Sequence, residues 1–212
     1  MIYSKVLNEK QLKLIRKIKS LPTGSYLAGG TALALQLGHR TSLDFDFYTD
    51  KHFETGRVLA DFQSNFDQIR LERVAKDTLT AEIDKVSLSL FYYPYNLINP
   101  LLDFENIKLA SIEDVLAMKM VAISMRGKRR DFIDAYYLLK KFSLDKIIKI
   151  TLKKYPSYQP MVILKGLIYF KNADLDDISR KIEILDKDFS WEKVKKKIFE
   201  EVEKYNWKEI AP

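Results

Sequence analysis

The segment that most constrains the fold spans residues 25–50 and reads SYLAGGTALALQLGHRTSLDFDFYTD. A short apolar run at residues 26–28 ends at a Gly-Gly pair, and the good helix formers at residues 31–37 end at Gly38. Residues 43–47 then alternate apolar and acidic side chains, which is typical of a strand with one buried face. The segment therefore predicts a strand, a turn, a helix and a second strand.

Asp44 and Asp46 are the acidic residues of the second of these strands. Side chains two residues apart in a strand share a face, so we expect both carboxylates on the side opposite to the apolar one. Two carboxylates this close repel each other unless a proton or a cation lies between them. Their hard oxygen atoms suit Mg²⁺ or Mn²⁺, so Asp44 and Asp46 are candidate metal ligands.

Gly29 and Gly30 stand where the first strand meets the helix. A glycine has no Cβ atom and lets a phosphate approach the backbone closely, and the N-terminus of a helix favours an anion. The glycine pair and the following Thr31 are therefore candidate nucleotide-binding residues.

A Gly-Gly turn, a helix and then Asp-x-Asp on a strand resemble the signature of polymerase-beta-like nucleotidyltransferases. The fuller run GGTALALQLGHRTSLDFDFYT is similar to a narrower group, the AbiEii/AbiGii toxin family of nucleotidyltransferases. The resemblance implies a metal-dependent enzyme that transfers a nucleoside monophosphate from a nucleoside triphosphate to an acceptor hydroxyl. It also implies a toxin with a separate antitoxin protein, and it makes RNA, tRNA in particular, a candidate acceptor.

Arg40 and Ser42, between the glycines and Asp44, are further candidate nucleotide-binding residues. Polymerase-beta-like enzymes commonly carry a third metal-binding carboxylate on a later strand, and by resemblance that position falls on Ser89 here. Two alternatives follow. Either Asp44 and Asp46 hold the metal ions with help from substrate phosphates and water, or the protein is a catalytically weakened member that binds nucleotide or RNA.

A second candidate cluster involves Lys119, which stands in the apolar stripe of a helix expected from Ser111 onward. A lysine on an inward face must meet an anion or reach the edge. The next helix places Asp131 and Asp134 three residues apart among apolar and aromatic residues. This arrangement is similar to the family's downstream motif, a lysine on one helix and an aspartate on the next, so all three are candidate catalytic residues.

Of the two aspartates we favour Asp134, because helix capping and the helix dipole already explain Asp131. We expect Lys119 and this aspartate to belong to the same site as Asp44 and Asp46. The alternative is an interhelical salt bridge that only fixes the packing of the two helices.

Arg126, Lys128 and Arg130 lie, together with Arg129, in the turn between these helices. Such a cluster of cations could receive a triphosphate or an RNA backbone. It could equally be a basic helix end that the dipole stabilises. The first interpretation adds Arg126, Lys128 and Arg130 to the candidate nucleotide-binding residues.

The periodicity predicts an α+β chain in two parts. Pro94 and Pro100 bracket a loop that we expect to end the strands, and from Ser111 apolar residues recur at helical spacing. We therefore expect a small mixed β-sheet with flanking helices at residues 1–105, which the family resemblance implies is a nucleotidyltransferase core. Residues 106–212 should form a C-terminal helical bundle that packs on the core and completes the active site.

The composition narrows the remaining function classes. The sequence contains no Cys, which excludes disulfides and thiolate metal sites. It shows neither a signal-like apolar segment at its N-terminus nor a run long enough to span a membrane, so we expect a cytoplasmic protein without a membrane partner. The net charge of +7 is compatible with a nucleic-acid partner and also with a basic protein that binds no polyanion.

Overall fold

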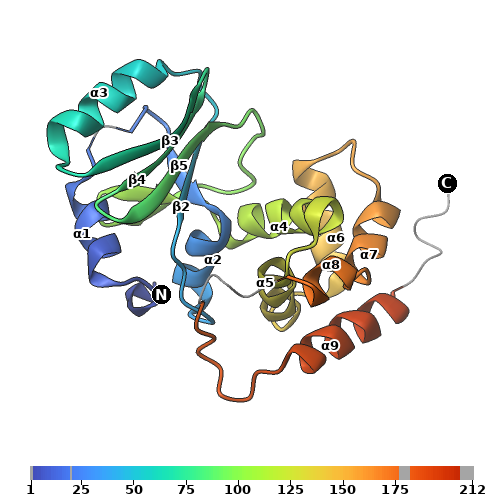
Figure 1. Ribbon diagram of the computed structural model, residues 1–212. Coiled ribbons are helices and arrows are strands. Elements are labelled where there is room, and N and C mark those ends of the chain that lie inside the picture. Colours follow the sequence, from blue (N-terminus) through green and yellow to red (C-terminus); the bar gives the residue numbers. More distant parts are fainter. Residues whose placement is uncertain (1, 20, 177–181, 206–212) are drawn as a thin grey trace. The chain divides into compact units, whose positions relative to one another are not determined.

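The computed structural model describes residues 2–19, 21–176 and 182–205, and the chain divides into two compact units between Ser111 and Ile112 (Figure 1). The first unit contains a β-sheet with helices, and the described part of the second unit is mainly helical. This is the α+β class predicted from the change of periodicity. None of the helices in the described ranges is long and apolar enough to cross a membrane.

The sheet of the first unit is mixed, as predicted. Over the described residues it has seven strands in the order β3-β4-β5-β2-β1-β7-β6. β2 runs parallel to β5 and β1 parallel to β7, whereas the other neighbours are antiparallel. The strands are β1 (Tyr26–Ala28), β2 (Phe45–Thr49), β3 (Ile69–Ala75), β4 (Thr78–Ile83), β5 (Val86–Tyr92), β6 (Leu102–Phe104) and β7 (Ile107–Leu109).

The alternation of apolar and polar residues in β5 matches its burial. Val86, Leu88 and Leu90 are buried, and the residues between them are half-buried. Asp84 and Lys85 form a tight turn into this strand, with φ angles of 48° and 69°. The apolar face of β5 belongs to the core of the first unit, so its other face can carry polar groups.

The strand predicted at residues 43–47 is shifted toward the C-terminus, because β2 begins at Phe45. Leu43, which we expected on the apolar face, is 39% exposed. The neighbouring strand β1 ends at Ala28, which pairs with Asp46, so the ladder between β1 and β2 does not extend to residues 43 and 44.

The helices of the first unit begin at well-defined signals. They are α1 (Glu9–Lys17), α2 (Gly29–Leu37) and α3 (Thr55–Asn65), preceded by a 3-10 turn at Ser4–Val6. Asn8 and Gln11 form a capping box that starts α1. α2 starts at Gly29, two residues earlier than predicted, and Gly38 ends it with a φ of 67°. α3 packs on β3 and β4, and α1 packs on β5.

β6 and β7 correct the expectation that the strands end at Pro94. Leu109 of β7 pairs in parallel with Leu27 of β1, and β6 pairs with β7 across a turn in which Glu105 has a φ of 50°. Both strands have three residues, too few to show an alternating pattern. β7 is a strand because it pairs with β1, which is far away in the sequence. The residues around β7 alone therefore do not predict it.

The second unit is organised around α4, against which α5, α6 and α7 pack. Its helices are α4 (Ile112–Arg126), α5 (Arg129–Leu139), α6 (Leu144–Lys154), α7 (Pro160–Leu167), α8 (Lys171–Asp174) and α9 (Trp191–Glu203). Lys154 Nζ donates to Asp114 Oδ1 at 2.8 Å, and neither side chain is exposed to solvent. This buried ion pair ties α6 to α4, and removing either partner would leave an uncompensated charge.

Candidate active site

Asp46 lies on β2 between two neighbouring strands. It pairs with Ala28 of β1 on one side and with Ser89 of β5 on the other. Residues directly opposite each other in a sheet share a face, so the Ser89 side chain is on the same face as Asp46. The register therefore places Ser89 beside Asp46, where the family resemblance located the third carboxylate.

Asp44 stands one residue before β2. Burial continues the alternation of the strand, since Phe45 and Phe47 are buried whereas Asp44 and Asp46 are half-buried. This pattern is the one expected for two carboxylates on the less buried side of an extended segment.

The Gly-Gly turn touches this region closely. Gly29 has a φ of 65°, and a Cβ atom there would lie 2.9 Å from Asp46 Oδ2. A Cβ atom on Gly30 would lie 2.5 Å from Arg40 Nη2. The absence of both side chains therefore lets the turn approach one predicted metal ligand and one predicted nucleotide-binding cation.

We expect Gly29→Ala to destabilise the protein by roughly 1–2 kcal/mol, because an L side chain at this φ is strained. The added methyl group should also displace the Asp46 carboxylate and lower any activity that depends on it. Chemical denaturation and a nucleotide-transfer assay would measure the two effects.

Gly56→Ala is the matched control for this variant. Gly56 lies in α3, and no heavy atom of the described residues lies within 4 Å of the place where a Cβ atom would stand. Because Ala is the better helix former, this change should be neutral or stabilising. A Gly29→Ala variant as stable as Gly56→Ala would mean that the turn at Gly29 tolerates a side chain.

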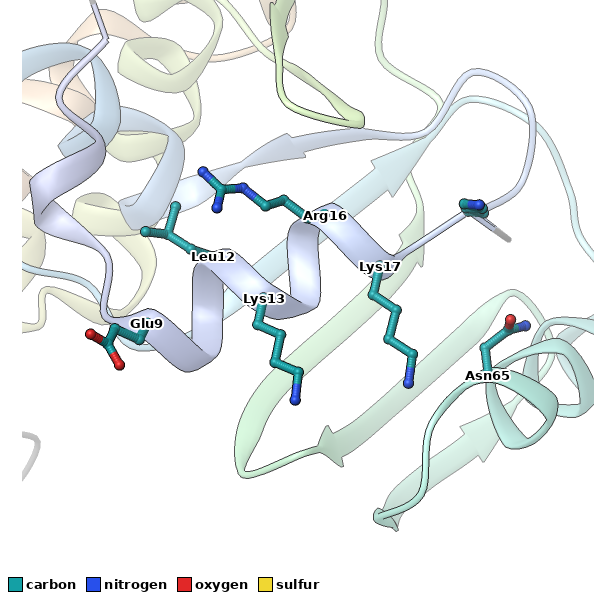
Figure 2. Close-up of a pocket in the computed structure, with 7 residues that line it drawn as sticks. Glu9, Leu12, Lys13, Arg16, Lys17 and Asn65 are labelled. Carbon is teal, nitrogen blue, oxygen red and sulfur yellow. The ribbon is translucent and has the colours of Figure 1, made fainter.

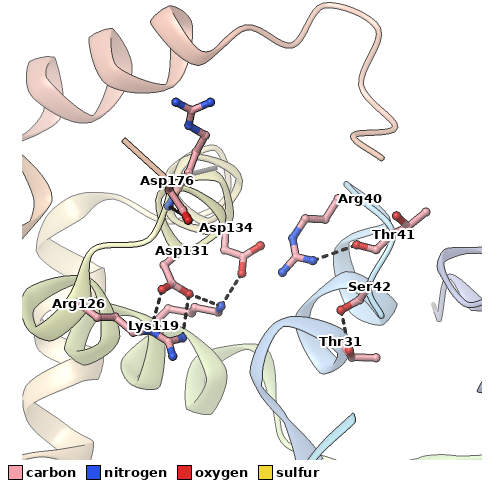
Figure 3. A network of polar contacts seen from close by, with 10 residues as sticks. Thr31, Arg40, Thr41, Ser42, Lys119, Arg126, Asp131, Asp134 and Asp176 are labelled. Atoms are coloured by element: carbon pink, nitrogen blue, oxygen red, sulfur yellow. Dashed lines mark hydrogen bonds and ion pairs between the residues drawn. The ribbon is translucent and has the colours of Figure 1, made fainter. Parts of the chain in front are cut away.

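The segment from Ser42 to Asp44 is fixed by hydrogen bonds. The Thr31 hydroxyl lies 2.6 Å from Ser42 Oγ and also contacts the carbonyl oxygen of Asp44 (Figure 3). Gln11 Nε2 of α1 donates to the Ser42 carbonyl at 2.8 Å. Thr31 and Ser42, which we predicted as nucleotide-binding residues, therefore also hold the segment that carries Asp44. Sequence reasoning missed Gln11, although its capping-box spacing was a signal for a fixed side chain.

Arg40 is a buried cation of the first unit, with 2% of its surface exposed. Its Nη1 donates to the carbonyl oxygen of Thr41 at 2.9 Å. A guanidinium group carries five N–H donors in a planar fork, a geometry that matches the oxygens of carboxylates and phosphates.

Lys119 in the second unit is 5% exposed and contacts both predicted aspartates (Figure 3). Its Nζ lies 2.8 Å from Asp131 Oδ1 and 2.7 Å from Asp134 Oδ2. Arg126 Nε adds a contact to Asp131 Oδ2 at 3.1 Å. Lys119 therefore contacts anions, as we expected for a lysine in the apolar stripe of a helix. We had favoured Asp134 because helix capping and the dipole could explain Asp131. That reason does not separate the two aspartates, because Lys119 contacts both.

Burial of Asp131 opposes its ionisation, but the nearby charges of Lys119 and Arg126 outweigh that effect and hold the pKa of the carboxyl below its ordinary value. Lys119 and Arg126 supply two positive charges against the two carboxylates. Lys119 and both aspartates of this network are withdrawn from water, whereas Arg126 is half exposed.

The other cations of the basic turn differ in their surroundings. Lys128 is exposed at the N-cap of α5, and Arg130 is half-buried in its first turn. Arg126, at the end of α4, keeps half of its side chain exposed while it contacts Asp131. These positions leave Lys128 and part of Arg126 accessible to an anion.

Arg129 has a structural role that the sequence did not indicate. Its backbone N–H donates to Asp176 Oδ2 at 3.0 Å, and its Nε donates to the Ala173 carbonyl at 2.9 Å. Its guanidinium carbon lies 5.1 Å from the centre of the Trp191 ring. Arg129 thus fixes the start of α5, the helix of Asp131, and its partners are too distant in sequence to be inferred.

The donor set around Asp44 and Asp46 fits a divalent cation that arrives with a nucleotide. Within residues 2–19, 21–176 and 182–205 no group of three or more His, Cys, Asp or Glu side chains could hold a metal ion. Mg²⁺, however, commonly uses one or two carboxylates together with waters and substrate phosphates. Two carboxylates with the Ser89 hydroxyl beside one of them meet that requirement.

Comparison with known proteins identifies the family. Residues 19–211 match the family described as nucleotidyl transferase AbiEii toxin of type IV toxin–antitoxin systems. The chain belongs to this family. An uncharacterized protein of Aquifex aeolicus (strain VF5) is 36% identical over 175 residues, which cover 79% of this chain and 84% of that protein. The resemblance drawn from the Gly-Gly and Asp-x-Asp run is confirmed.

Two solved structures share the fold of this AbiEii-family chain. JHP933 from Helicobacter pylori has a TM-score of 0.54 at 21% identity, with 96% of this chain and 92% of that chain covered. MenT4, a nucleotidyltransferase toxin from Mycobacterium tuberculosis H37Rv, also has a TM-score of 0.54, at 14% identity, with 92% and 81% covered.

Proposed function

We propose that this AbiEii-family protein transfers a nucleoside monophosphate from a nucleoside triphosphate to an acceptor hydroxyl, with Mg²⁺ or Mn²⁺ as cofactor. The observation that carries the proposal is the position of Asp46, which lies against the Gly29 turn and beside Ser89. A carboxylate next to a glycine turn that opens a helix can bind a cation and the phosphates it accompanies at the same place.

In this proposal Asp44 and Asp46 are the metal ligands and catalytic carboxylates. A divalent cation held there would neutralise charge on the triphosphate and make the α-phosphorus more electrophilic. Two carboxylates on the same side of an extended segment suit this role, because together they supply the negative charge and hard oxygen atoms that a divalent cation prefers.

Gly29, Gly30 and Thr31 receive the triphosphate in the proposed site. α2 begins without a side-chain cap, so its first N–H groups are suited to an anion. Arg40 adds a buried cation, and Ser42 adds a hydroxyl fixed by Thr31. Each contact fits negative charge on phosphate oxygens.

The proposed reaction is an in-line displacement. The acceptor oxygen forms a bond to the α-phosphorus while the bond from that phosphorus to the bridging oxygen breaks, and pyrophosphate leaves with the electron pair. We assign Asp134 as the group that takes the hydroxyl proton and Lys119 as the cation that stabilises charge on the phosphoryl oxygens. Asp131 is the third catalytic candidate, since it holds Lys119 in place.

Arg126, Lys128 and Arg130 are assigned to bind the nucleotide phosphates. The helical region, residues 106–212, would thereby complete a site begun by a core at residues 1–105. The exposure of Lys128 and of half of the Arg126 side chain supports this role.

Ser89 supports a second candidate function. Because it stands beside Asp46 where a third carboxylate would be expected, the protein could be a weakened member that binds nucleotide or RNA without turnover. The two candidates differ in one product: an active enzyme releases pyrophosphate, and a binding protein does not.

The proposal also covers the partner protein, the acceptor and the location in the cell. Membership in a family of type IV toxins supports a cognate antitoxin protein as partner. RNA, tRNA in particular, is the acceptor that we propose, and the cytoplasm is the proposed location. MenT4, which shares the fold, is itself described as a nucleotidyltransferase toxin.

Incubation of the purified protein with each α-labelled nucleoside triphosphate and total RNA tests the proposal. We expect label to appear in one size class of RNA, pyrophosphate to be released in equal amount, and both to require Mg²⁺ or Mn²⁺. Metal-enhanced nucleotide binding without either product would support the weakened member instead. Transfer that persists in excess chelator would contradict the metal requirement.

A further inference from the structure

A basic groove runs along the exposed side of α1 in the first unit (Figure 2). Four of the residues that line it are cationic. The groove is lined by Glu9, Leu12, Lys13, Arg16, Lys17, Lys19 and Asn65. Lys13 and Lys17 extend from the same side of the helix, one turn apart, and Asn65 of α3 stands opposite them. One acidic side chain, Glu9, therefore stands among four positive charges.

Most of this charge lacks a carboxylate partner in the described part of the chain. Arg16 Nη2 contacts Glu105 Oε1 at 2.9 Å, and Lys17 Nζ lies 5.0 Å from the centre of the Phe66 ring. Among the residues that the structure describes, Lys13 and Lys17 form no ion pair with a carboxylate. Like charges at this spacing on a helix repel each other, and an external anion would remove that repulsion.

The groove fits a polyanion in water better than a membrane surface. A helix that lies in a membrane interface needs a free apolar face. The apolar residues of α1, Leu14 and Ile15, and the adjoining Ile18 are buried in the core of the first unit and are at most 2% exposed. With its apolar side occupied, α1 offers only charges to an outside partner.

The groove also fits a phosphate backbone better than a protein. The centre of a protein interface is apolar and depleted in lysine, whereas Leu12 is the one apolar residue of this lining. Lysines one helical turn apart are separated by about 6 Å along the axis, so Lys13 and Lys17 can contact two phosphate groups of one strand. Regularly spaced point charges along a short groove match a chain of phosphates.

α1 is held firmly enough to present these charges. Its capping box fixes the first turn, Gln11 bonds the Ser42 carbonyl, and Asn106 Nδ2 donates to the Arg16 carbonyl at 2.5 Å. The helix that carries the groove is thus directly bonded to the segment that leads to Asp44. Lys13, Arg16 and Lys17 precede residues 19–211, the range that matches the family, so the family match does not account for them.

We propose that the α1 groove binds the phosphate backbone of an RNA strand. The site is additional to the nucleotide site around Asp46, and binding there does not depend on nucleotidyl transfer. If transfer to RNA occurs, the groove holds a part of the acceptor that does not react.

Fluorescence anisotropy with a fluorescein-labelled single-stranded RNA of mixed sequence tests the groove in the full chain. We expect K13Q/K17Q to weaken binding about tenfold and to lower the slope of log K against log[salt] by about 1.4, because two phosphate contacts are lost. Gln and Lys have similar helix propensities, so α1 should remain folded, which circular dichroism would check.

K51Q/K76Q is the matched control, since it removes two exposed lysines of the same unit outside the groove. It should leave the RNA affinity and the salt slope close to those of the unaltered protein. An equal loss in both double variants, or no RNA binding by the unaltered protein, would overturn the proposal. So would polyglutamate that competes as well as unlabelled RNA, because the groove would then accept acidic protein.

The same measurements separate this site from the proposed reaction. RNA binding that K13Q/K17Q weakens, in a protein that transfers no nucleotide, would support the groove and contradict the function. Nucleotide transfer together with RNA binding that K13Q/K17Q leaves unchanged would support the function and overturn the groove.

Discussion

Asp46→Asn should reduce nucleotidyl transfer by a factor of ~10³ or more, because an amide cannot supply the negative charge that holds a divalent cation against the triphosphate. The free energy of unfolding should change by less than about 1 kcal/mol, since Asn has nearly the same shape and the side chain is half-buried. Asp44→Asn should behave in the same way. A transfer assay at several Mg²⁺ concentrations, with chemical denaturation alongside it, measures both quantities.

Ser89→Asp is the companion variant for the Asp46 prediction. It places a third carboxylate on the face of Asp46, one strand away, and should raise the affinity for Mg²⁺ or Mn²⁺. Near-normal turnover in Asp44→Asn or Asp46→Asn would mean that the metal site lies elsewhere in the protein. Unchanged metal affinity in Ser89→Asp would show that position 89 does not reach the ion.

The sequence predicted those parts of the fold that local patterns control. The change to helical spacing marked the start of α4 within a residue of Ser111, and the glycine at position 38 marked the end of α2. The glycine pair predicted the strand-to-helix turn because a φ of 65° at Gly29 strongly favours that residue type. These features depend on a few neighbouring residues, which a sequence displays directly.

Features that depend on distant partners could not be predicted. β7 exists because Leu109 pairs with Leu27, and Arg129 is positioned by Asp176 and Trp191. The sequence did indicate that Lys119 needs an anion. It could not show that both aspartates of α5 meet the lysine, since that depends on how α5 packs against α4.

Lys119→Met should destabilise the helical unit by roughly 3–5 kcal/mol, because it leaves two buried carboxylates without the cation that both contact. Arg126→Met is the matched control: half of that side chain is exposed, so its loss should cost less than about 1 kcal/mol. Urea denaturation followed by tryptophan fluorescence reports this unit, because both tryptophans of the sequence, Trp191 and Trp207, lie after residue 111.

The pH dependence of the stability lost in Lys119→Met identifies the cause of that loss. The folded-state pKa of Asp131 is depressed, so its ionised form contributes stability above its unfolded pKa of about 4, and this stability is lost as the pH falls through the folded value. Without Lys119 the buried carboxylates can take up protons at higher pH, which lowers the cost of their buried negative charge. The deficit of Lys119→Met should therefore shrink as the solution is acidified toward pH ~4.

A deficit that stays constant from neutral to acid pH would mean that Lys119 acts through packing rather than charge. If Lys119→Met remains folded at low temperature and still transfers nucleotide at a normal rate, the lysine only fixes α4 against α5. A loss of nucleotide transfer in a Lys119→Met protein that circular dichroism shows to be folded would instead mean that the Lys119 charge acts in the reaction. In that case the fold is intact and only the cation is missing.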